Sequence, residues 1–343
     1  MRERIFSKAG AVVASLSLLL CAIAVPPAHA SSIVFAKRDA IWVVGPNGKR
    51  PVRVAHDRKY ASPSQADNGV IVALGDDNRL HRLCRCGRRL SAVSTWLGLG
   101  GGQGFAGPYR PRVSPDGTIV AYTFFHTQGL DPVTGTSQTQ GSVAYTYSRR
   151  YTPPRELGIV KGWDNPAWLG NATTMAFAPG ASAINPDLTN VAYHQLGHAD
   201  PGAPDDMHHA FTWFTDPAAP TMVFGDATRQ GDKLAVGEDG FAATRTIRLY
   251  AVTAKPPVTP DAALPQYRCG LTAAPGKDFT SLSWSPNGTS LAYEAGGSIY
   301  VIHVGSLTSD CNGLSRPRLL VRGGTSPSWG PAPARTGTGT RRP

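Results

Sequence analysis

Residues 281–304 read SLSWSPNGTSLAYEAGGSIYVIHV and contain three short strands separated by two tight turns. The first strand ends at Trp284 and is followed by a Ser-Pro-Asn-Gly turn. Apolar residues alternate along the second strand, at Leu291 and Tyr293, and again along the third strand after a Gly-Gly turn. Period-two alternation broken by Asn-Gly is typical of antiparallel β-hairpins.

The same template recurs along the chain. Residues 110–125 carry Ser-Pro-Asp-Gly before an alternating strand, and residues 165–177 align with residues 281–293 without a gap. Weaker copies lie at 61–74 and 228–236. The turns of these five copies centre on Asn68, Asp116, Asn171, Gln230 and Asn287. Spacings of 48 to 59 residues indicate repeats of one multi-stranded unit.

A sixth copy is split between the two ends of the chain. Residues 326–331, SPSWGP, supply a first strand, and residues 33–35 and 40–44 match the second and third strands. Pairing of the C-terminal strand with the N-terminal one would close a ring and remove the unpaired edge. The sequence therefore predicts an all-β fold, a six-bladed β-propeller of four-stranded antiparallel blades.

The Ser-Pro-Asp/Asn-Gly turns and the terminal Ser-Pro-Ser-Trp-Gly resemble the TolB-type, WD-like propeller repeats of exported bacterial proteins. The resemblance covers nearly all of the expected mature chain and implies the propeller fold. No α/β domain is expected ahead of the propeller, unlike in the better-known member of that family, so the family's role in an envelope complex is not carried over. Trp168, Trp284 and Trp329, at the ends of innermost strands, are expected to pack between blades.

Residues 1–30 are typical of an export signal. A basic start precedes an apolar run at residues 11–25 and an Ala-His-Ala cleavage site that ends at Ala30. A retained membrane anchor is the alternative, although about 15 apolar residues are fewer than the roughly 20 that a spanning helix needs. We expect a periplasmic or secreted protein with a single propeller domain at 31–330, a disordered tail at 331–343 and no transmembrane span.

The chain has a formal net charge of +11, of which +9 remains after removal of residues 1–30. This excess allows an anionic partner such as a cell-wall polymer or a lipid headgroup. The basic residues are scattered, however, with no dense run except Arg88-Arg89 and the tail, which favours ordinary solubility charge. Export argues against a nucleic-acid partner.

Four cysteines remain after the signal, an even number that predicts disulfides in an oxidising compartment. We expect Cys269 to pair with Cys311, which leaves Cys84 and Cys86 paired with each other or free. A metal site at Cys84 and Cys86 would need two further ligands at suitable spacing, and none follows.

Two insertions between second and third strands, at 126–141 in the third repeat and 179–190 in the fourth, are expected on one rim. Loops held by a rigid scaffold often carry function, so this rim is the default binding surface. The alternative is that both are solvated loops without a role. The candidate binding residues are His126, Asp131, Asn185 and Asp187.

Residues 194–209 have the composition of a metal site. Imidazole and carboxylate ligands suit zinc or another first-row ion. The spacing fits no helical zinc signature, and the more economical interpretation is an exposed polar loop. The candidate ligands are His194, His198, Asp205, His208 and His209. No other cofactor is expected.

Motifs of catalysis are absent: the sequence has no G-x-S-x-G, no phosphate-binding loop and no H-E-x-x-H. We therefore expect a non-catalytic binding or scaffold module that contacts a protein or glycan through rim loops, as a monomer or as part of an envelope assembly. The alternative is a glycan or peptide hydrolase or lyase with its site in the central channel. Carboxylates or histidines from several blades lining that channel would favour the enzyme.

Overall fold

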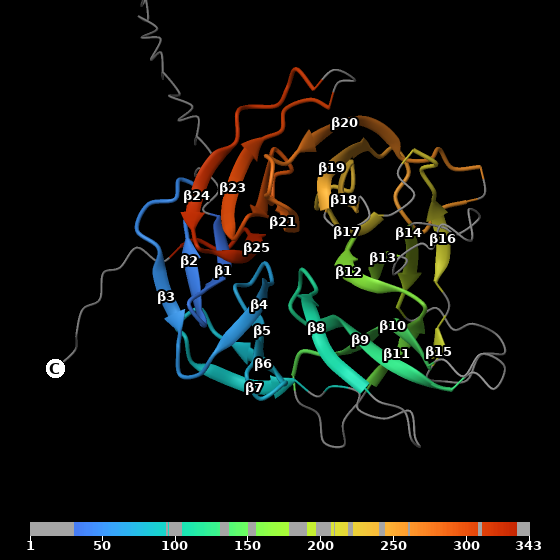
Figure 1. The fold of residues 1–343 in the computed structure, drawn as a ribbon. Helices are drawn as coiled ribbons and strands as arrows, with labels where there is room; N and C mark the ends of the chain where they lie inside the picture. Colours follow the sequence, from blue (N-terminus) through green and yellow to red (C-terminus); the bar gives the residue numbers. More distant parts are fainter. Residues whose placement is uncertain are drawn as a thin grey trace, which may run out of the picture.

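The computed structural model describes residues 31–93, 95, 105–130, 137–149, 156–177, 191–196, 207–208, 210–218, 222–239, 244–259, 261–307 and 311–334. Within these residues the chain is all-β and contains no helix. Six antiparallel sheets stand around a common axis as a propeller, with β4, β8, β12, β17, β21 and β25 innermost (Figure 1). The predicted fold is therefore confirmed.

Each blade runs from an inner strand at the axis to an outer strand at the circumference. The first blade contains β25 (Thr325–Gly330), β1 (Ser32–Lys37), β2 (Ala40–Val44) and β3 (Val52–Ala55). The second contains β4 (Tyr60–Gln65), β5 (Ile71–Gly75), β6 (Leu80–Leu83) and β7 (Arg89–Val93). The third contains β8 (Phe105–Val113), β9 (Ile119–Leu130), β10 (Ser137–Tyr147), β11 (Glu156–Lys161) and a short parallel fifth strand, β15 (Met207–His208).

The remaining three blades follow the same order. The fourth contains β12 (Asp164–Trp168), β13 (Thr173–Phe177), β14 (Val191–Gln195) and β16 (Phe211–Phe214). The fifth contains β17 (Met222–Ala227), β18 (Lys233–Asp239), β19 (Thr244–Ala251) and β20 (Gln266–Thr272). The sixth contains β21 (Phe279–Trp284), β22 (Ser290–Ala295), β23 (Ser298–His303) and β24 (Arg318–Arg322).

The ring closes through the two ends of the chain, as predicted. Strand β25 pairs antiparallel with β1, with Trp329 opposite Ile33 and Ser328 opposite Val34. Gln65, from the neighbouring blade, ties both strands together because its side-chain amide donates to the carbonyl oxygens of Ser32 and Ser328. Closure is therefore held by hydrogen bonds within the first blade and across to the second.

The turn chemistry of the repeats has a local cause. In the sixth blade, the side-chain oxygen of Asn287 accepts hydrogen bonds from Ser285 Oγ and Thr289 Oγ1, and Gly288 adopts a positive φ of 66°. Asp116 occupies the same place in the third blade. Such side chains satisfy the turn, and glycine tolerates the left-handed backbone that ends it.

The core lies between blades, where apolar faces of neighbouring sheets pack on each other. One such cluster joins Ile33 and Phe35 of the first blade to Ile299 and Val301 of the sixth. The three tryptophans of the innermost strands are buried, as expected: Trp168, Trp284 and Trp329 have 3 to 6% of their surface exposed.

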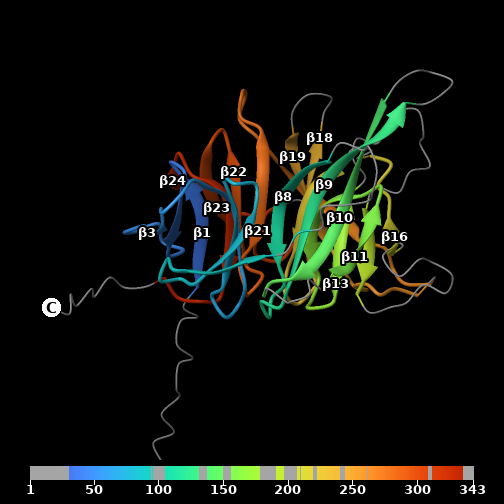
Figure 2. The ribbon, with the colours of Figure 1, turned by 90° about the horizontal axis from the view of Figure 1, so that it is seen from below.

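The propeller is a disc with two faces. We call the side on which the inner strands begin the mouth face, and the side on which they end the turn face. Because strands alternate in direction, the links between second and third strands lie on the mouth face. The long β9–β10 hairpin extends beyond that face (Figure 2).

Candidate functional site

A cavity of about 240 Å³ lies on the propeller axis at the mouth face. Every blade contributes to it through residues of its inner strand. The lining residues of the inner strands are Ser62, Pro63, Arg110, Pro111, Arg112, Asn165, Pro166, Phe224, Gly225, Thr280, Ser281, Thr325 and Ser326. Since no single repeat builds this cavity, it exists only in the closed ring.

The inner strands bulge where they line the cavity. Ser62, Arg110, Asn165 and Ser326 each precede a proline, each has a φ of 47° to 51°, and each lies at a shift in the strand register. A bulge re-aims side chains and is frequent beside functional sites. Left-handed backbone at non-glycine residues costs on the order of 1–3 kcal/mol and persists where the surrounding structure imposes it. Four blades thus repeat one strained feature around the cavity.

Two buried carboxyl groups from different blades flank the mouth. Asp164 is 8% exposed, and burial raises the pKa of its carboxyl to about 6, although Arg110 and Asn165 favour the ionised form. Glu294, which also lines the cavity, accepts a hydrogen bond of 2.8 Å from the backbone N–H of Ser326. Burial raises the pKa of Glu294 as well, against the effect of Arg110.

Arg110 is the exposed cation between these acids. Its guanidinium donates to the side-chain oxygen of Asn165 and acts electrostatically on both carboxyl groups. The mouth therefore offers a cation, an amide and two carboxyl groups whose pKa values burial raises, that of Asp164 to about 6. It can both donate hydrogen bonds to a polar ligand and accept them from it.

A second charged pair lies deeper on the axis. Arg112 borders both the mouth cavity and a smaller chamber of about 40 Å³ below it, and Asp226 lines that chamber. Burial raises the pKa of Asp226, while Arg112 and the backbone N–H of Trp284, at 2.8 Å, act in the opposite direction. The pair thus separates the two cavities.

The chamber is closed at the turn face. Arg229 of the fifth blade and Asp67 of the second form an ion pair of 2.6 Å across the ring. The indole N–H groups of Trp168 and Trp284 donate to the carbonyl oxygens of Arg112 and Asp226, which fixes the chamber walls. The axial channel is therefore open at the mouth face and blocked at the turn face.

Of the binding residues expected on the rim, the structure describes only His126, which does not line this cavity. His126 is 3% exposed on β9 and packs against the rings of Phe105 and Phe124, with centroids about 6 Å apart. Its side chain is therefore buried and does not lie on the rim surface where a second molecule would bind. Asp131, Asn185 and Asp187 lie outside the described residues.

The expected metal ligands are likewise not gathered by the described part of the structure. His194 is 4% exposed and packs against the ring of Tyr145 at 5.1 Å, in the core between the third and fourth blades. His198, Asp205 and His209 lie outside the described residues, as does the side chain of His208. No group of three or more metal-binding side chains occurs among the residues that the structure describes. A metal ion at 194–209 stays a prediction.

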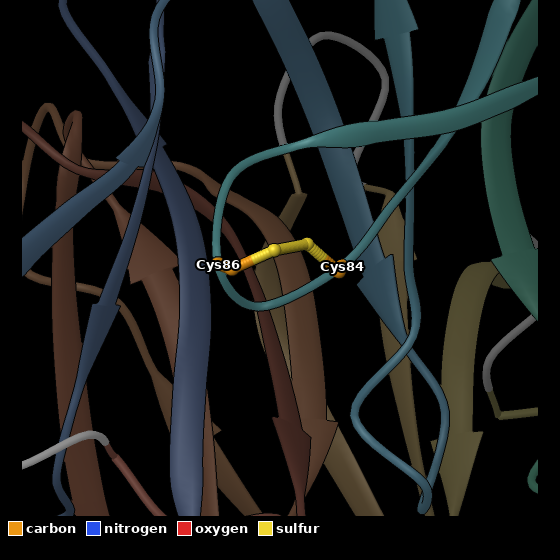
Figure 3. The surroundings of a disulfide bond; sticks show 2 residues. All are labelled: Cys84 and Cys86. Atoms are coloured by element: carbon orange, nitrogen blue, oxygen red, sulfur yellow. A yellow bond between two sulfur atoms is a disulfide. The ribbon is translucent and has the colours of Figure 1, made fainter.

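Both cysteine pairs are joined in the structure. Cys269 on β20 bonds to Cys311 and links the fifth blade to the sixth. Cys84 bonds to Cys86 within the turn between β6 and β7 (Figure 3). The turn packs closely against the first blade at Gly87, where a Cβ would lie 1.6 Å from the carbonyl oxygen of Val54. Only glycine fits at this position.

Sequence reasoning missed the charged residues of the channel. Arg110, Arg112, Asp164, Asp226 and Glu294 belong to four different blades and share no local motif. One signal was present: a residue-proline pair recurs five residues before the turn centre in three copies, at 62–63, 110–111 and 165–166. This pair marks where an inner strand lines the axis.

Comparison with known proteins supports the fold. No protein-family model and no curated protein matches the chain. Among solved structures, TolB from Acinetobacter baumannii aligns with a TM-score of 0.54 at 12% identity, over 87% of this chain and 66% of that one. A putative TolB from Agrobacterium tumefaciens aligns with a TM-score of 0.49 at 12% identity, over 85% and 88% of the two chains. The Cps50 (Swd1) propeller domain of Myceliophteria thermophila reaches 0.45 at 11% identity, over 84% and 86%.

At these identities the likeness shows the fold alone. The resemblance of the repeats to TolB-type propellers is thus confirmed at the level of architecture. No helix in the described part of the chain is both long and apolar enough to cross a membrane.

Proposed function

We propose that the chain is an exported, non-catalytic binding module whose propeller holds a protein partner at the mouth face. The observation that carries this proposal is the axial cavity, which draws on all six blades and is bordered on its inner side by Arg112. Export rests on the signal-like residues 1–30.

The size and chemistry of the cavity favour the tip of a protein segment. At about 240 Å³ it is smaller than the roughly 300–1,000 Å³ of pockets that enclose a whole small ligand. It carries donors and acceptors together, which suits a peptide with its alternating N–H and C=O groups. The β9–β10 hairpin beyond the same face would add to the roughly 800 Å² per partner of a stable protein interface.

Site-specific photo-crosslinking tests this proposal. A photoreactive residue replaces Tyr109, which is 40% exposed beside the mouth, or the matched control Tyr267, which is 47% exposed on an outer strand. In an envelope extract of the source cells, we expect a discrete protein adduct at position 109 and none at 267. Thr280→Tyr, which fills the mouth, should abolish that adduct. Equal labelling at both positions, or an adduct insensitive to Thr280→Tyr, would refute mouth binding.

A glycan hydrolase or lyase is the second candidate, favoured by the carboxyl groups of Asp164 and Glu294. A buried acid with a pKa of about 6 is suited to donate a proton at neutral pH. A screen of the purified mature protein against envelope glycans decides between the two functions. Turnover that Asp164→Asn and Glu294→Gln each abolish would replace the binding proposal with the enzymatic one.

A further inference from the structure

The net positive charge is concentrated in the first two blades. Residues 31–93 contain twelve lysines and arginines against five aspartates, a balance of +7. The mature chain as a whole carries +9, so the remaining 250 residues contribute only +2. The charge that looks scattered in sequence is therefore unevenly placed in the fold.

Part of this charge gathers on the turn face. Three links between third and fourth strands lie there in successive blades: the β23–β24 link of the sixth, the β2–β3 link of the first and the β6–β7 link of the second. Each presents two exposed cations. These six residues, which we call the basic turn cluster, are Arg316, Arg318, Lys49, Arg50, Arg88 and Arg89.

The first blade contacts the links on both of its sides. Arg318 of the sixth blade donates to the carbonyl oxygens of Pro46 and Asn47 in the first, at 2.6 and 3.3 Å. Gly87 of the second blade packs against the Val54 carbonyl of the first. The basic turn cluster is therefore one continuous surface across three blades.

The described part of this surface has no counter-charge of its own. The described parts of the three links, residues 45–51, 84–88, 304–307 and 311–317, contain no aspartate or glutamate. Asp310, in the β23–β24 link, lies outside the described residues. None of the ion pairs in the described structure involves a member of the cluster. Six like charges held together repel one another, and an anionic partner would relieve that repulsion.

A groove accompanies the cluster. It has a volume of about 810 Å³, lies on the turn face between the sixth and first blades, and is bordered by Arg316, Arg318 and His303. Val301 and Trp329 form part of its wall. The groove continues the cluster into a depression that can hold a chain.

We propose that the turn face binds a linear phosphate-bearing polymer. The groove would hold one segment of the polymer, and the basic turn cluster would bind the phosphates of the adjoining segment. Five of the six cations are arginines, whose guanidinium groups match phosphate in a bidentate manner. A membrane surface fits less well, because surface-bound segments insert large apolar side chains, and the tips of these links carry proline, asparagine and glycine.

Binding of inorganic polyphosphate to the mature protein tests the proposal. We expect measurable binding at about 50 mM salt and a steep loss of affinity on raising the salt, because neutralised phosphates release counterions. The quadruple variant Lys49→Gln/Arg50→Gln/Arg88→Gln/Arg89→Gln should weaken binding by about tenfold or more and lower the log–log salt slope by about 3, from roughly 0.7 per lost contact.

The second blade offers a matched control. Lys59→Gln/Arg79→Gln removes two exposed charges at the opposite end of the blade, where they border the mouth face. The affinity of this double variant for polyphosphate should be nearly unchanged, whereas the affinity of Arg88→Gln/Arg89→Gln should fall several-fold. Equal losses in the two double variants would reduce the effect to net charge and overturn the proposal. Vesicles with anionic phospholipid form a second arm, and binding to them without binding to polyphosphate would overturn it in favour of a membrane.

Discussion

The two faces of the propeller use the same strands in opposite ways. At the mouth face, the inner strands bulge before prolines and surround a cavity with titratable carboxyl groups. At the turn face, tryptophan indoles and the side chain of Gln65 join the strand ends to their neighbours. At the turn face, hydrogen bonds between blades hold the strand ends and close the ring. The mouth face can therefore accommodate strained and charged residues.

This contrast extends to the kind of charge. The mouth face holds Asp164, whose pKa is raised to about 6, whereas the turn face holds arginines and one lysine that stay charged throughout. We therefore expect the mouth to respond to pH and the turn face to respond to salt.

Removal of the central cation should have the largest effect on stability. Arg112→Met leaves the buried Asp226 carboxyl with Arg229 as its remaining opposite charge, and loss of the first cation should cost on the order of 3 kcal/mol. Chemical denaturation at pH 7.5 measures this loss. Because the pKa of Asp226 would rise further, the loss should shrink as the pH falls and the carboxyl becomes neutral.

The double variant Arg112→Met/Asp226→Asn is the control for this interpretation. It removes both charges and should recover most of the lost stability. If it is as unstable as Arg112→Met alone, the role of Arg112 is packing and not charge, and the channel would lack its central pair.

Loss of the closure side chain should come next. Gln65→Ala leaves the buried carbonyl oxygens of Ser32 and Ser328 without this donor, and Arg85 loses one of its two side-chain acceptors but keeps Ser32 Oγ. We expect a loss of about 2–3 kcal/mol. Thr280→Ala, at an exposed residue of the mouth, removes one side-chain hydrogen bond to Glu294 and should cost about 1 kcal/mol. Similar losses for both in thermal melts would contradict the division between a sealed end and a tolerant end.

The fold was predictable because its signals are local. A Ser-Pro-Asn-Gly turn between alternating strands, as at 285–288, specifies a hairpin wherever it occurs, and regular spacing then specifies the number of blades. The split copy at 326–331 and 33–44 even located the closure. Each of these inferences needs only residues that are close together in the chain.

The channel and the turn face could not be predicted in this way, because both are assembled from distant segments. Asp164 and Glu294 are 130 residues apart, and Arg88 and Arg316 are 228 residues apart. Conversely, His126 and His194 are of a residue type common in functional sites, but the alternation of side chains along their strands directs both into the core. The residue type of these histidines suggested a binding or metal site, but the pairing register of their strands places both side chains in the core.

Protonation at the mouth should produce an effect on stability that depends on pH. Since burial raises the pKa of Asp164 to about 6, the folded protein keeps a proton that the unfolded chain has lost between about pH 4 and pH 6. Stability should fall as the pH rises through this window, by up to about 3 kcal/mol, and level off above it. Glu294 acts in the same direction.

Denaturation curves of the wild type and of Asp164→Asn, measured from pH 4 to pH 8, check this expectation. The variant should have the flatter profile and should gain on the wild type as the pH rises. Parallel profiles would mean that Asp164 titrates normally and that the mouth is not the pH-responsive face.

Opening the floor of the channel should have the smallest effect on stability. The Arg229–Asp67 pair is 31% and 40% exposed, so Arg229→Gln should cost less than about 1 kcal/mol. The same change removes the ion pair that closes the chamber beneath Trp168 and Trp284, and quenching of tryptophan fluorescence by acrylamide should therefore increase. Lys233→Gln, which removes a neighbouring surface pair with Asp232, should leave quenching unchanged. If Arg229→Gln leaves quenching unchanged too, the chamber is sealed by packing alone, and the two ends of the channel differ in side-chain density and not in an ionic closure.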